Sequence, residues 1–152
     1  MTRPAEEIAD QLRDRGLRAT TTRVAVLRAV SELDGHPDTD TIAGRVRQSL
    51  GTISTQAVYD GLHAMTRVGL LRRIEPAGSP ARYETRVDDN HHHLVCRSCG
   101  AISDVDCVIG DPPCVTPTDA GGFLVDEAEV TFWGLCPDCQ TSPTHQEKES
   151  GA

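Results

Sequence analysis

Four cysteines stand in two pairs of the same spacing, Cys96-x-x-Cys99 and Cys136-x-x-Cys139, with 36 residues between the pairs. Each pair can place two thiolates on one metal ion, and two such pairs complete a tetrahedral site. All-sulfur coordination selects zinc or an iron–sulfur centre. We predict structural zinc, because four protein ligands leave no open position for catalysis. The main alternative is a redox dithiol, which normally needs only one pair, near a helix start.

Three consecutive histidines come shortly before the first cysteine pair. In a strand, His91 and His93 would point to the same side and could chelate one ion. Glu84 and Asp104 are the nearby oxygen donors, and His36 lies in a loop before a helix. A mixed nitrogen and oxygen set suits Fe(II), Mn(II) or Zn(II). On spacing alone, a second metal site and solvated histidines are equally good interpretations.

Cys107 and Cys114 belong to neither pair. They flank or enter a segment, residues 109–122, that is rich in Pro, Gly and Asp and is predicted to be a loop. We interpret the two residues as buried or incidental thiols, with a redox pair as the alternative.

The composition limits the class of protein. The chain has 152 residues, enough for one ordinary domain or two small ones, and only 3% aromatic residues. It contains no apolar run of about 18 residues, so we expect no membrane span. The N-terminus reads as an amphipathic helix with acidic residues, not as a signal peptide. We therefore predict a cytoplasmic protein, in which paired cysteines more often bind metal than form disulfides.

Charge is divided unevenly along the chain, whose net charge is -8. Residues 1–86 carry 13 Arg and 11 Asp or Glu, a net of +2, whereas residues 87–152 carry one Arg, one Lys and 12 acidic residues, a net of -10. Such asymmetry indicates a half that faces nucleic acid and a half with other duties. A net of +2 also fits an ordinary solvated surface.

Apolar periodicity predicts four helices in the first half. The second helix follows Thr20–Thr22, the third begins at Asp38 or Thr39, and the fourth begins at Ser54 or Thr55. A short third helix, a tight turn at Gly51 and a polar-faced fourth helix make a helix-turn-helix pattern. The polar residues of the fourth helix can bond to base edges and phosphates: Thr55, Gln56, Tyr59, Asp60 and His63.

Two short predicted strands, residues 70–74 and 81–85, surround a Pro/Gly-rich turn and form a hairpin. A helix-turn-helix followed by such a hairpin describes a winged helix, with Arg72, Arg73 or Arg82 available for phosphates. A plain helical domain with a polar face explains the pattern equally well. In the second half we predict strands at residues 91–96, 101–105, 123–125 and 130–133, and a disordered tail from Thr141.

These motifs together resemble the ferric uptake regulator superfamily of metal-dependent repressors. The likeness covers about residues 5–140 and is greatest with the peroxide-sensing branch that includes the FurA, CatR and PerR regulators. It rests on both cysteine pairs and on four further motifs: Gly35–Pro37, Gln56–Tyr59, Arg82–Glu84 and His91–Cys96.

The resemblance implies an α+β protein. An N-terminal winged-helix domain (residues 1–86) binds palindromic double-stranded operator DNA, and residues 87–90 form a hinge. A small C-terminal α/β domain (residues 91–140) dimerises and holds the four-cysteine zinc site, and residues 141–152 form a disordered tail. It further implies a regulatory Fe(II) or Mn(II) site that bridges the two domains, with these ligands: His36, Glu84, His91, His93 and Asp104.

Some positions depart from the family pattern. Peroxide sensors carry Asp where this chain has Glu84, but they resemble it at Asp104, where iron sensors tend to have Glu. A third metal site of many relatives uses a histidine where this chain has Ala128, so we do not predict that site. The Pro-rich residues 109–122 replace much of the usual dimerisation helix.

We therefore predict a homodimeric, metal-dependent repressor that senses peroxide and controls catalase or other oxidative-stress genes and its own promoter.

 

In this prediction Gln56 and Tyr59 contact bases or phosphates, and the phosphate contacts come from Arg18, Arg72 and Arg73. An iron- or zinc-uptake regulator is the alternative with the same fold. A non-haem metalloenzyme is the alternative from another class. We do not predict an enzyme, because the sequence offers no evident nucleophile or acid/base pair beyond the metal ligands.

Overall fold

The computed structural model describes residues 3–109 and 113–141 and divides the chain into two compact units, one ending at Asp88 and one beginning at Asp89. The predicted disordered tail from Thr141 lies, beyond that first residue, outside the described residues. Each unit is described separately below. Within the described ranges, no helix is long and apolar enough to cross a membrane.

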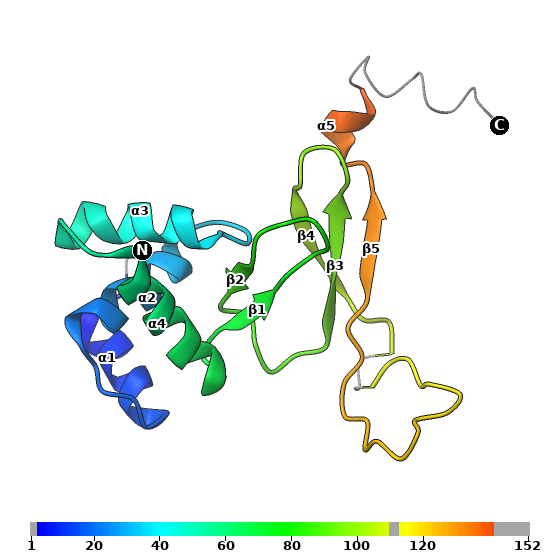
Figure 1. The fold of residues 1–152 in the computed structure, drawn as a ribbon, viewed down its shortest axis with the longest axis horizontal. Helices are drawn as coiled ribbons and strands as arrows, with labels where there is room; N and C mark the ends of the chain where they lie inside the picture. Colours follow the sequence, from blue (N-terminus) through cyan, green and yellow to red (C-terminus); the bar gives the residue numbers. More distant parts are fainter. Residues whose placement is uncertain (1–2, 110–112, 142–152) are drawn as a thin grey trace. The chain divides into compact units, whose positions relative to one another are not determined.

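The first unit holds four helices and a hairpin (Figure 1). The helices are α1 (Ala5–Asp14), α2 (Thr21–Glu32), α3 (Thr39–Leu50) and α4 (Thr55–Arg67), followed by β1 (Arg72–Ile74) and β2 (Arg82–Glu84). β1 and β2 pair antiparallel, with Arg73 opposite Tyr83. The predicted helix-turn-helix and winged hairpin are therefore present.

Three of these helices begin where a side chain caps the backbone. Thr20 Oγ1 accepts the Arg23 N–H (3.2 Å), Asp38 Oδ1 accepts the Thr41 N–H (2.8 Å), and Ser54 Oγ accepts the Ala57 N–H (3.1 Å). Gly51, at φ 77°, then ends α3 in a backbone conformation that glycine adopts without strain.

One aliphatic core holds the first unit together. It is built from the apolar stripes of all four helices and is closed by residues of the hairpin region. Because the inward stripes are used in this core, the polar face of α4 remains outside. The fully buried aliphatic members include Ile8, Leu12, Val26, Ile42, Val46, Val58, Leu62 and Met65.

The second unit is a three-stranded sheet in the order β4-β3-β5 (Figure 1). β3 (His91–Cys96) pairs antiparallel with β4 (Ile102–Asp106) and parallel with β5 (Thr131–Gly134). A four-residue helix, α5 (Pro137–Gln140), follows β5. β3 is thus the central strand, and it carries both the histidines and the first zinc-pair cysteine.

The predicted strand at Phe123–Val125 is wrong. Among the described residues this segment pairs with no strand, and Phe123 and Leu124 are 81% and 97% exposed. Gly121 and Gly122 both have positive φ, and the Phe123 N–H bonds to the Ala120 carbonyl, which forms a turn. A β-prone composition is not enough without a neighbouring strand to accept its hydrogen bonds.

Candidate functional site: two clusters of metal-binding side chains and a polar helical face

The four paired cysteines meet at one point of the second unit. Their sulfur atoms all lie within 4.8 Å of one another, and Cys99 Sγ is 3.7 Å from Cys136 Sγ. A tetrahedron with Zn–S bonds of about 2.3 Å has edges of about 3.8 Å. The side chains therefore fit a tetrahedral zinc ion with little rearrangement.

Backbone N–H groups favour the thiolate form at this cluster. The Cys136 N–H donates to Cys96 Sγ at 3.3 Å. N–H groups of Cys136, Cys99 and Ser98 outweigh desolvation and lower the pKa of Cys96 to about 6. Gly100, at φ 76°, lets the chain reverse here, and its N–H bonds to the Cys96 carbonyl at 3.0 Å.

The pKa of Cys139, the last cysteine of the cluster, shows the effect of placing four thiols close together. A hydrogen bond from Ser98 lowers the pKa of Cys139, but Cys136, burial and the other two cysteines together raise it to about 12. Four neighbouring thiolates repel one another unless a cation neutralises them. Because cysteine binds zinc as the thiolate, a divalent metal ion among these four sulfurs would neutralise their repulsion.

Two predicted ligands of the regulatory site meet in the first unit. His36 Nε2 lies 2.8 Å from Glu84 Oε2, and both side chains are only 4% exposed. Burial of a carboxylate is costly unless a hydrogen bond or a positive charge compensates it. Arg72 Nε is 3.9 Å from Glu84 Oε1 and supplies part of that charge.

Hydrogen bonds across 46 residues hold His36 beside the hairpin. The Tyr83 N–H donates to the Pro37 carbonyl (3.0 Å), and Arg82 Nη1 donates to the His36 carbonyl (3.3 Å). Asp38 adds a bridge to Arg82 and caps α3. The loop before α3 is therefore fixed on β2, which explains why residues so far apart in sequence meet.

The other three predicted ligands meet in the second unit. His93 and Asp104 are direct cross-strand partners on β3 and β4. Asp104 Oδ1 lies 3.6 Å from His93 Nε2 and 3.8 Å from His91 Nε2, and the two rings meet edge to face at 4.9 Å. Two imidazole nitrogens and a carboxylate oxygen thus converge on one small volume.

Asp89 orients one of these rings and was not predicted from the sequence. Its Oδ1 lies 2.7 Å from His91 Nδ1. A neutral His91 that donates from Nδ1 presents a lone pair at Nε2, toward the carboxylate of Asp104. Two acceptors face each other there, so a cation between them is favoured. A carboxylate two residues before a histidine is the sequence signal that marks this role.

The polar face of α4 is accessible in the first unit. Tyr59 is 47% exposed, and Gln56 and Thr55 are exposed as well. Gln56 Nε2 donates to Asp60 Oδ1 (2.9 Å), and Thr55 Oγ1 accepts from Arg47 Nη2 (3.1 Å). Hydrogen bonds within the protein therefore order these side chains at the start of the helix.

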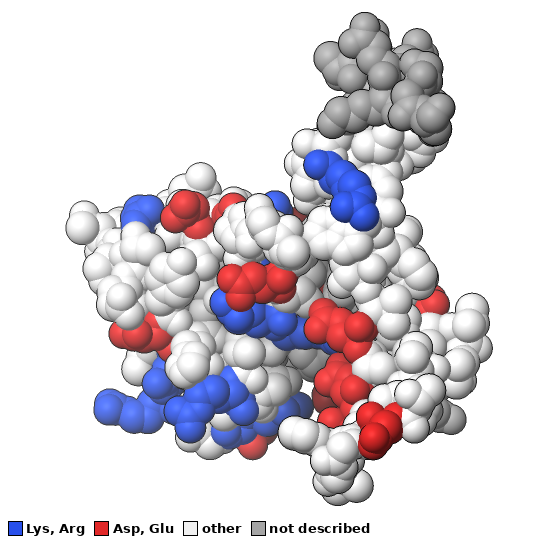
Figure 2. Space-filling model, turned by 45° about the vertical axis from the view of Figure 1, so that its right-hand side comes forward, with Lys and Arg blue, Asp and Glu red and all other residues white. Residues whose placement is uncertain are grey.

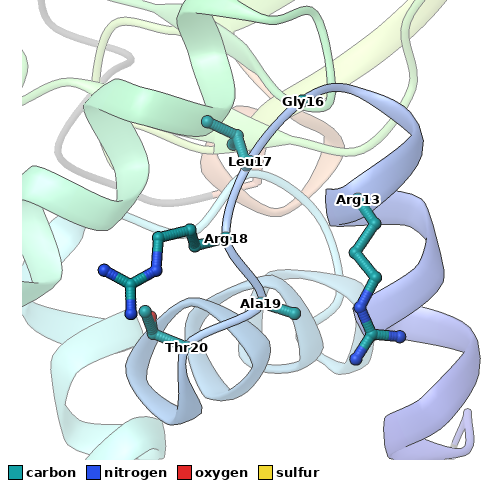
Figure 3. A pocket seen from close by; sticks show the side chains of 6 residues that line it. All are labelled: Arg13, Gly16, Leu17, Arg18, Ala19 and Thr20. Carbon is teal, nitrogen blue, oxygen red and sulfur yellow. The ribbon is translucent and has the colours of Figure 1, made fainter.

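The predicted phosphate-contacting arginines differ in their surroundings. Arg18 lies in the segment between α1 and α2, beside a depression of about 530 Å³ that is also lined by Arg13 and Thr20 (Figure 3). Arg73 is exposed and bonds to Glu75 at 2.8 Å. Arg72 is only 18% exposed and lies near Glu84, so its surroundings fit phosphate contact less well than those of Arg18.

Basic side chains are concentrated in the first unit, and Figure 2 shows several blue groups at its lower left, beside red and white side chains. Residues 89–141 contain a single Arg and no Lys, against nine Asp or Glu. All but one of the arginines in the described residues therefore belong to the unit with the helix-turn-helix.

Comparison with known proteins gives consistent relatives. Residues 14–110 match the ferric uptake regulator family. Transcriptional regulator FurA of Mycobacterium tuberculosis is 61% identical over 138 residues, which cover 91% of this chain and 93% of that protein. The peroxide-responsive repressor PerR of Staphylococcus saprophyticus is 27% identical over 135 residues, covering 89% and 90%.

A solved structure shows the same fold. The Helicobacter pylori ferric uptake regulator Fur, described as having three functional metal binding sites, matches with a TM-score of 0.70. The match covers 93% of this chain and 97% of that one at 19% identity. At this identity the likeness concerns the fold alone.

Proposed function

Because the chain belongs to the ferric uptake regulator family, we propose that it is a metal-dependent, homodimeric repressor that senses hydrogen peroxide. The chain is a transcriptional regulator of that family and not an enzyme. The single observation that carries the finer proposal is the convergence of His91, His93 and Asp104 at the centre of the second unit.

The proposed regulatory site combines this convergence with the buried pair of the first unit. In it, His36 and Glu84 bind the same Fe(II) or Mn(II) ion as the three ligands of the second unit. A mixed imidazole and carboxylate set suits these metals, and its oxygen content sets it apart from the four-sulfur cluster. The four-sulfur cluster holds structural zinc in the proposal.

Metal binding then controls DNA binding by selecting one arrangement of the two units. A ligand shifts a conformational equilibrium only by its differential affinity for the two states. An ion that needs ligands from both units binds one arrangement more tightly, and DNA binding gains by the same coupling free energy. In that arrangement, Gln56 and Tyr59 contact the operator and Arg18 and Arg73 contact phosphates, with Arg72 in a supporting position.

The sheet of the second unit supports the dimer part of the proposal. Leu94 and Phe132 are cross-strand partners on neighbouring strands, and they are 45% and 47% exposed. Exposed apolar residues gathered on one face of a sheet mark an interaction surface. A second copy of the chain would cover this face and would place two recognition helices on a palindromic operator. We place such a regulator in the cytoplasm.

Peroxide sensing is proposed to act through the nitrogen ligands. Iron supplies the peroxide chemistry when it is bound. In the proposal, the imidazole of His36 or His91 gains an oxygen atom, and this oxidation removes one ligand. The similarity to a peroxide-responsive repressor and the presence of aspartate at position 104 support this part.

Two measurements test the proposal. Binding to the DNA upstream of the protein's own gene is measured by gel shift with and without Mn(II) or Fe(II); binding that ignores both metals contradicts the sensor. The Fe(II) form is then treated with peroxide, and the masses of its peptides are measured by mass spectrometry. A gain of one oxygen atom on the His36 or His91 peptide supports peroxide sensing.

An iron- or zinc-uptake regulator is the second candidate, and the description of the matching family favours iron. It predicts metal-dependent DNA binding with unmodified histidine peptides after peroxide. The same pair of measurements therefore separates the two candidates.

A further inference from the structure

Three side chains of the second unit form a cluster that neither metal site uses. They are His92 on the central strand β3, Cys107 directly after β4, and Cys114 in the following loop. One nitrogen and the two sulfur atoms lie within 4.8 Å of one another. His92 is buried, whereas both cysteines are partly accessible to solvent.

Hydrogen bonds determine which nitrogen of His92 carries the proton. The Val130 N–H donates to His92 Nδ1 at 3.3 Å, which places the proton of a neutral ring on Nε2. His92 Nε2 lies 3.0 Å from Cys114 Sγ and therefore donates to the sulfur. An ion bound at Nε2 would require the proton on Nδ1, where it would face the Val130 N–H. The geometry therefore favours a hydrogen-bonded thiol over a metal ligand.

The two cysteines also interact with each other. Burial raises the pKa of the Cys114 thiol, and its hydrogen bond and charge interaction with Cys107 raise it further. Cys114 therefore keeps its proton and donates it toward the Cys107 sulfur. The Cys114 sulfur lies within 4.8 Å of the Cys107 sulfur, so it can reach an oxidised Cys107, and its proton can be passed to the hydroxyl group that leaves.

We propose that Cys107 and Cys114 are a reversible thiol redox pair that hydrogen peroxide converts to a disulfide. The Cys107 thiolate attacks one peroxide oxygen and breaks the O–O bond, which leaves a sulfenic acid and, after proton uptake, one water. The Cys114 sulfur then attacks the Cys107 sulfur, its thiol proton leaves with the hydroxyl group as a second water, and the S–S bond forms. Two thiols are oxidised by two electrons, and one peroxide is reduced to two waters.

This pair is distinct from the proposed oxidation of His36 or His91, because it needs no iron. It also leaves the zinc cysteines unchanged. Peroxide would therefore have a second target in the protein, one that cellular thiols can reset.

The sequence makes the pair easy to assay. A protease that cleaves before aspartate releases Cys107 in residues 106–110 and Cys114 in residues 111–118. It separates both from the peptides of the four zinc cysteines. The zinc-loaded, iron-free protein is treated with peroxide in tenfold excess, and its free thiols are alkylated. The digest is then analysed by mass spectrometry with and without a reducing agent.

The expected product is peptide 106–110 joined to peptide 111–118, with the loss of two hydrogen atoms, and it disappears on reduction. Zinc stays at one ion per chain. In Cys114→Ser the joined peptide is absent, and a sulfenic-acid probe labels peptide 106–110. In the matched variant Cys107→Ser, peptide 111–118 stays unlabelled.

Three outcomes would overturn the proposal. Both peptides can remain fully alkylated after peroxide. The disulfide can instead form among the zinc cysteines with release of zinc. Finally, the wild-type protein can bind a second zinc ion that both serine variants lose, which would make the cluster a metal site.

Discussion

The two groups of predicted metal ligands differ in how they are assembled. The four-sulfur cluster lies wholly within the second unit, where the turn after β3 and the short helix α5 bring its sulfurs to tetrahedral spacing. The histidine and carboxylate set is divided, with His36 and Glu84 paired in the first unit and the other three ligands in the second.

This difference indicates different duties. A site contained in one small unit stabilises that unit and has no second state to report. A site whose ligands belong to two units can bind tightly in only some of their arrangements, so it can act as a signal. The predictions below test this contrast, beginning with the largest expected effect.

Cys136→Ser should abolish zinc binding and unfold the sheet of the second unit. A structural zinc site contributes an apparent binding free energy of about 10–16 kcal/mol in small domains, which exceeds the stability of most domains of this size. Elemental analysis should show zinc falling from one ion per chain to none. Amide hydrogen exchange should show loss of protection in β3 and β5, with protection in α2 and α4 retained.

The matched control for this experiment is Cys107→Ser, which removes a cysteine outside the four-sulfur cluster. It should keep its zinc and its hydrogen-exchange pattern. A folded, protected sheet in zinc-free Cys136→Ser would show that zinc is not needed for folding.

Asp104→Ala should remove the metal response while leaving zinc in place. Allosteric coupling typically changes affinity 5–150-fold, so we expect Mn(II) to strengthen operator binding by about that factor in the wild-type protein and hardly at all in the variant. Fluorescence anisotropy with labelled operator DNA measures both. Asp126→Ala, an exposed carboxylate of the same unit, is the control and should respond normally. An undiminished Mn(II) response in Asp104→Ala would remove Asp104 from the ligand set.

Asp89→Ala should weaken Mn(II) binding by a smaller factor, about 10–100-fold, because Asp89 is hydrogen-bonded to the predicted ligand His91 and is not itself a predicted ligand. Asp89→Asn keeps an oxygen acceptor, so its Mn(II) affinity should lie between those of Asp89→Ala and the wild-type protein. Calorimetric titration of Mn(II) gives the affinities. Equal affinities in all three proteins would contradict the positioning role.

The elements that depend on local signals could be predicted from the sequence. Helix boundaries are set by signals that act over only a few residues, namely the capping residues Thr20, Asp38 and Ser54 and the turn at Gly51. The cysteine spacing likewise predicts a cluster, since each pair forms its own turn. The segment at 123–125 failed because a strand depends on a partner that lies elsewhere.

Contacts between distant residues could not be predicted in the same way. The pairing of His36 with Glu84 depends on the bonds that fix the Pro37 carbonyl on β2, 46 residues away. Strand alternation puts His92 on the opposite side of β3 from His91 and His93, but only the sheet and the returning loop show that Cys114 meets it there. Such contacts follow from the tertiary fold and leave no periodic pattern in the sequence.

Asp38→Ala should give the smallest effect, and it should be confined to the first unit. Loss of an N-cap costs about 1 kcal/mol, and Asn at this position should restore most of it.

The hydrogen bonds with Thr41, and to a smaller extent the charge of Arg82, lower the pKa of Asp38 below 3.8. A carboxyl group whose pKa is lower in the folded state stabilises the protein fully above its unfolded pKa and loses that contribution as the pH falls through the folded value. The difference in unfolding free energy between wild type and Asp38→Ala, measured by urea titration of the helical circular dichroism signal, should therefore shrink below about pH 4. It should be the same at neutral pH with and without a zinc chelator, because α3 belongs to the unit that has no cysteine. A difference that changes with the chelator would show that the stability of the first unit depends on the zinc site of the second.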